Sequence, residues 1–288
     1  MRITELYGRG APVISFEFFP PKSDEGFRSL FRTIEELKRL APGFVSVTMG
    51  AGGSTRAKTV ELVIRIQREL GITAMAHLPC LGFDRAGIDA ILESLREGGV
   101  ENVLALRGDV PRDAPGFAVP PGGFAHANEL ARFVAARGGF AIGGACYPEK
   151  HPEAPSPEAD LRHLAQKVAD GAEFLITQLF FDNARYFDFV ARVRAAGIRV
   201  PVVPGIMPIT SVTSIRRMTA LGGGSIPPEL DAELSRVDED DDATLEVGIA
   251  WATAQCRELL DRGVPGIHFY TLNRSPATRR IHGALFDA

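Results

Sequence analysis

Length, composition and charge already exclude several classes of protein. The chain has 288 residues, of which 45% are hydrophobic and 24% charged, with a formal net charge of -4. That balance supplies enough apolar surface for a core, and one α/β barrel commonly reaches roughly 250 residues. The acidic balance excludes a broad basic face for nucleic acid or acidic lipid. With no secretory signal and no run of about 18 apolar residues, we expect a cytoplasmic protein without a membrane partner.

Short runs rich in Val, Ile and Phe alternate with amphipathic stretches along the whole chain. Eight runs have the length and composition of buried strands: Val13–Phe18, Phe44–Thr48, Thr73–His77, Asn102–Leu106, Ala141–Cys146, Glu173–Gln178, Val200–Val203 and Gly266–Tyr270. Helices are predicted between them at Phe27–Leu40, Thr55–Leu70, Arg85–Glu97, Asn128–Arg137, Pro157–Asp170, Arg185–Ala196 and Ser211–Leu221. This alternation predicts a single (β/α)8 barrel, an α/β TIM barrel, over residues 1–288.

The last unit departs from the repeat. An acidic run from Asp238 to Asp242 is followed by a helical stretch to about Arg262, so we expect one extra helix before the final strand. Two long loops, Asp109 to Gly123 and Tyr147 to Pro157, follow the fourth and fifth strands. Barrel enzymes keep their chemistry on the loops that follow their strands.

Polar side chains end or interrupt six consecutive strands. They are Glu17, Thr48, His77, Arg107 with Asp109, Tyr147 and Gln178. Because the carboxyl ends of parallel strands meet on one rim, these residues predict a polar pocket there. The three cysteines, by contrast, form no CxxC pair and no His/Cys cluster, so we expect buried thiols and no metal site.

Glu17 is the sharpest candidate. Phe16, Phe18 and Phe19 flank it, which should desolvate the carboxylate, raise its pKa and suit it to general acid catalysis. The alternative is a structural glutamate paired with an arginine. Asp109 could likewise form a local ion pair with Arg107, and His77 could be a core histidine bonded to a carbonyl. The chain has no Walker or Rossmann glycine loop, so a nucleotide cofactor would be held differently.

Seven segments together resemble the bacterial methylenetetrahydrofolate reductase family, over nearly the whole chain. They are SFEFFPP (15–21), FVSVT (44–48), ALRGD (105–109), YPEKHPE (147–153), ITQLFFD (176–182), PGIMP (204–208) and HFYTLNR (268–274). The resemblance implies a (β/α)8 barrel that binds FAD at its C-terminal rim and forms homo-oligomers. It also implies a ping-pong reaction, in which NADH or NADPH supplies the hydride that converts 5,10-methylenetetrahydrofolate to 5-methyltetrahydrofolate.

The resemblance also assigns roles to single residues. Glu17 matches the acid that opens the folate ring, and Asp109 matches a catalytic aspartate near flavin and pterin. Gln178 and Arg274 match folate contacts. The positions that match the FAD site are Thr48, His77, Arg107, Gly108, Asp109, Tyr147, His151, Asp160 and Lys167.

Four positions depart from the family pattern. His126 stands where many bacterial members have Tyr beside the adenine, and His163 and Gln166 replace Asn and Arg. We still place both histidines in the FAD site. His126 aligns with the position beside the adenine, and His163 shares a helix face with Asp160 and Lys167. Met218 replaces the Phe that stacks on the nicotinamide cofactor, and we place it in the substrate site.

These departures leave open a reductase without tightly bound flavin. The competing hypotheses are a proline dehydrogenase-like flavin barrel, a non-catalytic folate or flavin binding module, and a regulatory subunit. Gln178 and Arg274 argue against the first, and Glu17 argues against a module that lacks a positioned acid. We expect a regulatory subunit to carry an extra sensing domain, which the sequence does not show.

Overall fold

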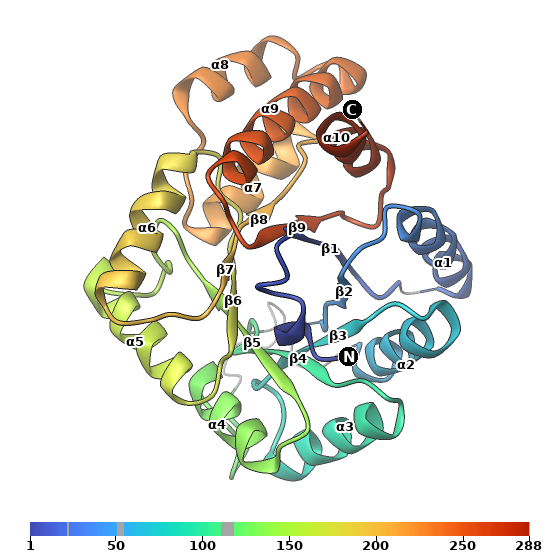
Figure 1. The fold of residues 1–288 in the computed structure, drawn as a ribbon, viewed down its shortest axis with the longest axis vertical. Coiled ribbons are helices and arrows are strands. Elements are labelled where there is room, and N and C mark those ends of the chain that lie inside the picture. The colour runs from blue at the N-terminus through green and yellow to red at the C-terminus, as the bar shows by residue number, and fades with distance from the viewer. Residues whose placement is uncertain (22, 51–54, 111–117, 288) are drawn as a thin grey trace.

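Buried apolar runs form the strands of the structure, and all the described strands are parallel (Figure 1). The computed structural model describes residues 1–21, 23–50, 55–110 and 118–287. Its strands are β1 (Val13–Phe18), β2 (Phe44–Val47), β3 (Ala74–Pro79), β4 (Asn102–Leu106), β5 (Ala141–Cys146), β6 (Phe174–Thr177), β7 (Val202–Val203), β8 (Gly205–Ile206) and β9 (Gly266–Tyr270). The sheet runs in the order β7-β6-β5-β4-β3-β2-β1-β9-β8, so the (β/α)8 prediction is confirmed.

The seventh barrel strand is split into two short pieces. β7 pairs with β6, whereas β8 pairs with β9, and Pro204 lies between the two pieces. Proline has no backbone N–H to give to a ladder, so the strand changes partner at this residue. The predicted strand Val200–Val203 therefore begins too early and ends too soon.

Helices cover the outside of the sheet (Figure 1). They are α1 (Asp24–Lys38), α2 (Arg56–Arg65), the π-helical turn η3 (Ile66–Leu70), α3 (Arg85–Glu97), α4 (Ala127–Arg137), α5 (Pro157–Ala169), α6 (Asn183–Ala195), α7 (Val212–Gly222), α8 (Pro228–Arg236), α9 (Asp241–Asp261) and α10 (Pro276–Phe286). Several begin at an Asp or Ser whose side chain accepts a backbone N–H of the first turn, as Ser156 does at α5. None of the described helices is long and apolar enough to cross a membrane.

The region before the last strand is more helical than predicted. The expected extra helix is α9, which starts at the acidic run with Asp240 as its N-cap. A second one, α8, precedes it and was not predicted. It begins directly after Pro227, with Pro228 in its first turn, where a proline costs no hydrogen bond.

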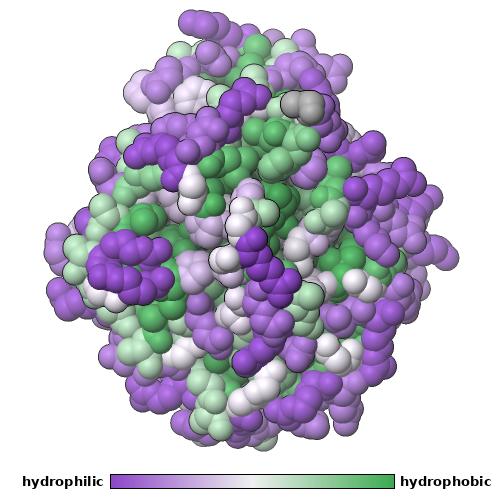
Figure 2. Space-filling model, in the orientation of Figure 1, coloured by the Kyte–Doolittle hydropathy of each residue, from purple (hydrophilic) through white to green (hydrophobic). Residues whose placement is uncertain are grey.

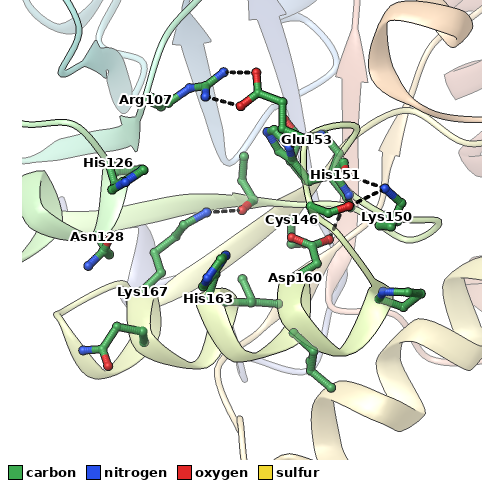
Figure 3. A pocket seen from close by; sticks show the side chains of 18 of the residues that line it. Arg107, His126, Asn128, Cys146, Lys150, His151, Glu153, Asp160, His163 and Lys167 are labelled. Carbon is green, nitrogen blue, oxygen red and sulfur yellow. Dashed lines mark hydrogen bonds and ion pairs between the residues drawn. The ribbon is translucent and has the colours of Figure 1, made fainter. Parts of the chain in front are cut away.

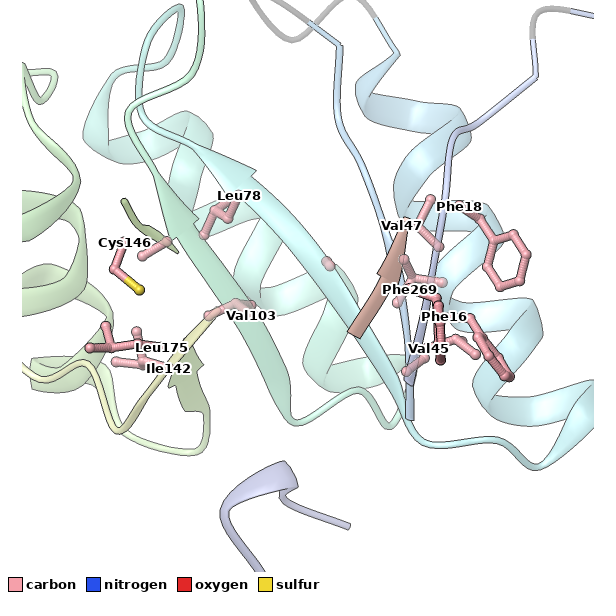
Figure 4. Packing of buried hydrophobic residues seen from close by; sticks show 14 of the residues in the cluster. Phe16, Phe18, Val45, Val47, Leu78, Val103, Ile142, Cys146, Leu175 and Phe269 are labelled. Carbon is pink, nitrogen blue, oxygen red and sulfur yellow. The ribbon is translucent and has the colours of Figure 1, made fainter. Parts of the chain in front are cut away.

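Two apolar layers hold the barrel together. Phe16, Phe18, Val45, Val103 and Leu175 belong to the outer layer, between strands and helices (Figure 4). The inner layer fills the part of the barrel near the amino ends of the strands, where the short 3-10 helix η1 (Ile3–Glu5) inserts Ile3 among side chains from six strands. Figure 2 shows that side chains fill the centre of this face, with hydrophilic residues concentrated around its edge.

The interior changes character along the barrel axis. Near the amino ends of the strands the interior is apolar, because it is filled by Ile3, Val13, Met75 and their neighbours. Toward the carboxyl ends of the strands, the buried residues include Glu17, His77 and His268. The polar pocket predicted from the strand ends thus begins inside the barrel.

Gly205 provides a test of the split strand. A Cβ at this position would lie 2.6 Å from the hydroxyl of Tyr270 and closer still to the carbonyl oxygen of Thr177. We expect Gly205→Ala to lower the free energy of unfolding by about 1–3 kcal/mol, the usual cost of overpacking. Gly224→Ala is the control, since its Cβ would meet its nearest atom at 3.4 Å. Equal urea midpoints for the two variants would contradict the described packing.

Candidate active site

Strand alternation directs Glu17 into the barrel. Phe16 and Phe18 belong to the outer apolar layer, so Ser15 and Glu17 between them face the interior. Glu17 is 7% exposed, at the carboxyl end of β1. The phenylalanines that flank it in sequence therefore lie on the opposite face of the strand.

Two histidines from other strands meet the Glu17 carboxylate. His77 Nε2, from β3, lies 3.2 Å from Glu17 Oε2, and His268 Nε2, from β9, lies 3.4 Å from the same oxygen. His268 Nδ1 lies 2.8 Å from the hydroxyl of Ser15. If Ser15 donates to Nδ1, the neutral His268 ring carries its proton on Nε2 and donates it to Glu17. We call Glu17, His77 and His268 the acid cluster.

The expected rise in the pKa of Glu17 is wrong for this structure. Burial raises the pKa, but the charge of His77 and the hydrogen bonds from both imidazoles outweigh it and hold the pKa at about 2. The carboxylate is buried as expected, and the expectation fails because two histidines from other strands, which the sequence around Glu17 does not show, meet it. The alternative of an arginine partner is not what the structure shows, because among the described residues both ion-pair partners of Glu17 are histidines.

His268 is a site residue that was not predicted from the sequence. It is fully buried, and its ring stacks on Phe44 with a centroid separation of 5.8 Å. The sequence held one clue to this residue, because His268 is the first residue of the HFYTLNR segment. In the structure it lies opposite Ser15 in the parallel pairing of β1 with β9. His77 is likewise buried against Glu17, and the core alternative, a bond to a carbonyl, is not what the structure shows.

A cavity of about 330 Å³ lies between the start of α4 and α5, which lines it from the first turn to Lys167 in the last turn; Glu17, His77 and His268 do not line it. Seven of the predicted site residues line it: Arg107, His126, Tyr147, His151, Asp160, His163 and Lys167. Figure 3 shows Asp160, His163 and Lys167 along α5, as their spacing predicted. The cavity therefore unites residues from the fourth and fifth barrel units.

Lys167 brings a half-buried ammonium group to this cavity. Its ammonium donates to the carbonyl of Ala145 at 2.7 Å, and no carboxylate among the described residues lies within ion-pair distance of it. Burial lowers the pKa of Lys167 accordingly. Gly144 makes room for the side chain, because a Cβ there would lie 2.8 Å from Lys167 Cδ.

Arg107 is the second cation of the cavity. Its guanidinium forms a bidentate ion pair with Glu153, with Nη2 at 2.8 Å from Oε1 (Figure 3). The local pair with Asp109, considered as an alternative from the sequence, is thus not its contact. Glu153 belongs to the loop between β5 and α5, so the pair ties this loop to the end of β4.

That loop is held in place by further contacts. The ammonium of Lys150 donates to the carbonyls of His151, Pro152 and Ala154 at 3.1, 3.4 and 2.7 Å. The backbone N–H of His151 donates to Asp160 at 2.9 Å. The His151 ring lies against Tyr147, whose pKa is raised to about 12 by burial. These contacts present both rings to the cavity.

Two of the departures from the family pattern have a visible setting. His126 is the N-cap of α4, and the carboxylate of Glu129 accepts its backbone N–H. Gln166 donates its amide to Asp170 at 3.0 Å, in a cluster where Asp170 also accepts from Asn128 and Arg132. Asp170 thus links α4 to α5 and occupies one amide hydrogen of Gln166.

The remaining predicted residues do not line the cavity: Thr48, Gly108, Asp109, Gln178 and Arg274 follow strands of the rim, and Met218 lies on α7. Asp109 and Arg274 are exposed, whereas Gln178 folds back so that its side-chain oxygen accepts the N–H of Leu179 at 2.9 Å. Met218 is half-buried on α7. Of the loop Asp109 to Gly123, residues 111–117 lie outside the described residues.

The acid cluster predicts how stability depends on pH. The folded pKa of Glu17, about 2, lies below the ordinary value of 4.5. The ionised carboxylate thus contributes stability that is present above about pH 4.5 and lost as the pH falls toward 2. We expect the advantage of wild type over Glu17→Gln in urea midpoint to be smaller at about pH 4 than at about pH 6. An advantage that grows on acidification would contradict the pairing.

Comparisons with known proteins agree with the family resemblance of the sequence motifs. The sequence model of the family described as methylenetetrahydrofolate reductase matches residues 2–285. A 5,10-methylenetetrahydrofolate reductase of Pectobacterium carotovorum subsp. carotovorum is 36% identical, over 97% of this chain and 91% of that protein. Methylenetetrahydrofolate reductase (NADH) 1 of Arabidopsis thaliana is 39% identical over 94% of this chain, which spans only 48% of the plant protein.

A solved structure supports the fold alone. An uncharacterized Clostridium thermocellum protein, described as binding two copies of 5-methyl-5,6,7,8-tetrahydrofolic acid, superposes with a TM-score of 0.63. It shares 14% sequence identity, and the superposition covers 100% of this chain and 98% of that protein. The family match and the bacterial relative, by contrast, extend along almost the whole sequence. The chain belongs to the methylenetetrahydrofolate reductase family.

Proposed function

We propose that the chain reduces 5,10-methylenetetrahydrofolate to 5-methyltetrahydrofolate with NADH or NADPH, using FAD held at the cavity between α4 and α5. The observation that carries the proposal is the buried carboxylate of Glu17, which lies between two imidazoles at the end of β1. A cavity with cationic donors lies on the same rim of the barrel. Membership of the family supports the folate reaction. The plant relative is named as an NADH enzyme, which favours NADH as the first reductant to test.

The donors of the cavity suit an anionic dinucleotide. Lys167 supplies an ammonium without a carboxylate partner among the described residues, and the first turn of α4 lines the same cavity with Ala127 and Asn128. Arg107, His126 and His163 add further N–H donors. When bound, FAD would supply the hydride carrier that the side chains of this chain lack. Lys167 and Arg107 would hold its phosphates.

Glu17 is the residue we assign to proton transfer. Opening the five-membered ring of the substrate requires a proton at its N10. A carboxyl group with a pKa of about 2 is ionised at rest, so Glu17 must first gain a proton. His77 Nε2 and His268 Nε2, at 3.2 and 3.4 Å, are the neighbouring atoms that can deliver it to Oε2. The acid cluster as a whole would thus hold the proton that Glu17 passes to N10.

The cofactor assignment is tested by removing the charge of Lys167. We expect the purified wild type to show flavin absorbance and to release FAD on denaturation. Lys167→Met keeps the length of the side chain but removes the ammonium, so the Kd for FAD should rise roughly 10- to 100-fold, the worth of a hydrogen bond to a charged group. Titration of the apoprotein with FAD measures it.

Lys38→Met is the matched control, because it removes the same charge from an exposed position on α1. Its Kd for FAD should equal that of wild type. If both variants bind FAD as the wild type does, Lys167 has no part in holding the cofactor. A wild type that turns over folate without any flavin would select the flavin-independent alternative.

Glu17→Gln tests the acid. The amide keeps the shape of the side chain but cannot donate an acidic proton, so the folate half-reaction should slow by roughly 10²–10⁴. The nicotinamide half-reaction needs no proton from this position and should stay within about tenfold, a barrier change below roughly 1.4 kcal/mol. Stopped-flow absorbance at the flavin band measures each half separately. A folate half-reaction at the wild-type rate would transfer the assignment to Asp109.

A further inference from the structure

The turn after β9 has an uncommon backbone. Leu272 and Asn273 are consecutive residues with φ of 51° and 60°, in the left-handed region that favours glycine. Asparagine tolerates this region better than most residues, but leucine does not. A chain keeps such a conformation only where the surrounding contacts impose it.

The contacts that impose it run to the end of β1. The side-chain oxygen of Asn273 accepts the backbone N–H of Phe19 at 2.8 Å, and its amide nitrogen donates to the carbonyl of Phe19 at 2.8 Å. The hydroxyl of Thr271 donates to the carbonyl of Glu17 at 2.6 Å and accepts the N–H of Asn273 at 3.2 Å. We call these four bonds the turn clamp.

The turn clamp lies where the strand ladder has ended. The pairing of β1 with β9 stops at Glu17 opposite Tyr270, and β1 itself stops at Phe18. Asn273 then offers one acceptor and one donor to Phe19, as the next residue of a neighbouring strand would. The turn clamp therefore continues the connection to β9 beyond Glu17, where the pairing of β1 with β9 has ended.

The turn clamp joins two parts of the proposed site. Glu17 lies on β1, and Arg274, which follows Asn273 directly, is the residue we expect to contact folate. Ser275 extends the connection, since its hydroxyl donates to Glu36 of α1 at 2.6 Å. The first and last units of the barrel thus meet at the turn.

We propose that Asn273 is a positioning residue, which sets the place of the Glu17 carboxylate relative to the turn that carries the folate-contacting Arg274. The inference rests on the proposed function. Displacements of about 1 Å in reacting groups can cost roughly 100-fold in rate, so the turn clamp affects the step in which Glu17 acts. The nicotinamide half-reaction, which does not use Glu17, is insensitive to it.

The test compares Asn273→Gly with Leu272→Gly. Both changes relax a left-handed residue and add the same backbone freedom, but only Asn273→Gly removes the bonds to Phe19. Asn273→Gly should slow the folate half-reaction roughly 10- to 100-fold and leave the nicotinamide half-reaction within about twofold. Leu272→Gly should leave both within about twofold. Amide hydrogen exchange of Phe19 reports the turn clamp without any substrate, and exchange should accelerate in Asn273→Gly alone.

The outcomes separate the two proposals. A wild type with a protected Phe19 amide that cannot reduce methylenetetrahydrofolate overturns the proposed function, and with it the catalytic role of Asn273. An active wild type whose Asn273→Gly variant keeps the folate half-reaction overturns the positioning role alone. Equal losses in both half-reactions, or equal losses in both variants, also overturn it, because they indicate general damage to the barrel.

Discussion

The site depends on a buried carboxylate that, in the described part of the chain, has histidines rather than an arginine or lysine as its ion-pair partners. Removing Glu17 from water is costly, and the cost is offset only because two imidazoles converge on one of its oxygens. Those imidazoles come from β3 and β9, so the contact requires the strands on both sides of β1 to be in register. The chemistry of the rim is thus coupled to the closure of the barrel. A weak contact between Glu17 and a lysine on the surface would not require neighbouring strands to be in register.

The cofactor cavity is built on a different principle. Its walls are the start of α4, one side of α5, the end of β5 and the loop between β5 and α5, and that loop is held by charged side chains that bind backbone atoms, as Lys150 does. Asp170 links α4 to α5 from the side away from the loop. The polar groups of the loop and of the two helices are thus bonded to one another. The ammonium of Lys167 is left without a carboxylate partner among the described residues. An anionic ligand would complete that arrangement.

Much of the barrel could be predicted because strand and helix periods are local properties of the sequence. Among the residues that line the cavity, Arg107 and Tyr147 could be predicted from strand ends and Asp160, His163 and Lys167 from their spacing on α5, whereas His126 and His151 came only from the family resemblance. The environment of Glu17 was not, because the identity of its partners depends on which strands become neighbours. His268 is 251 residues away from Glu17 in sequence. The short helix α8 was not predicted for a different reason, because its nine residues show little periodicity.

The split seventh strand has a consequence for how the barrel comes apart. β7 and β8 each contribute two residue pairs to their neighbours, whereas β1 and β9 share five. Opening the wall at Pro204 therefore breaks fewer ladder bonds than opening it between β1 and β9. We therefore expect local unfolding to begin at this seam, because β7 and β8 each have fewer paired residues than β1 and β9 share.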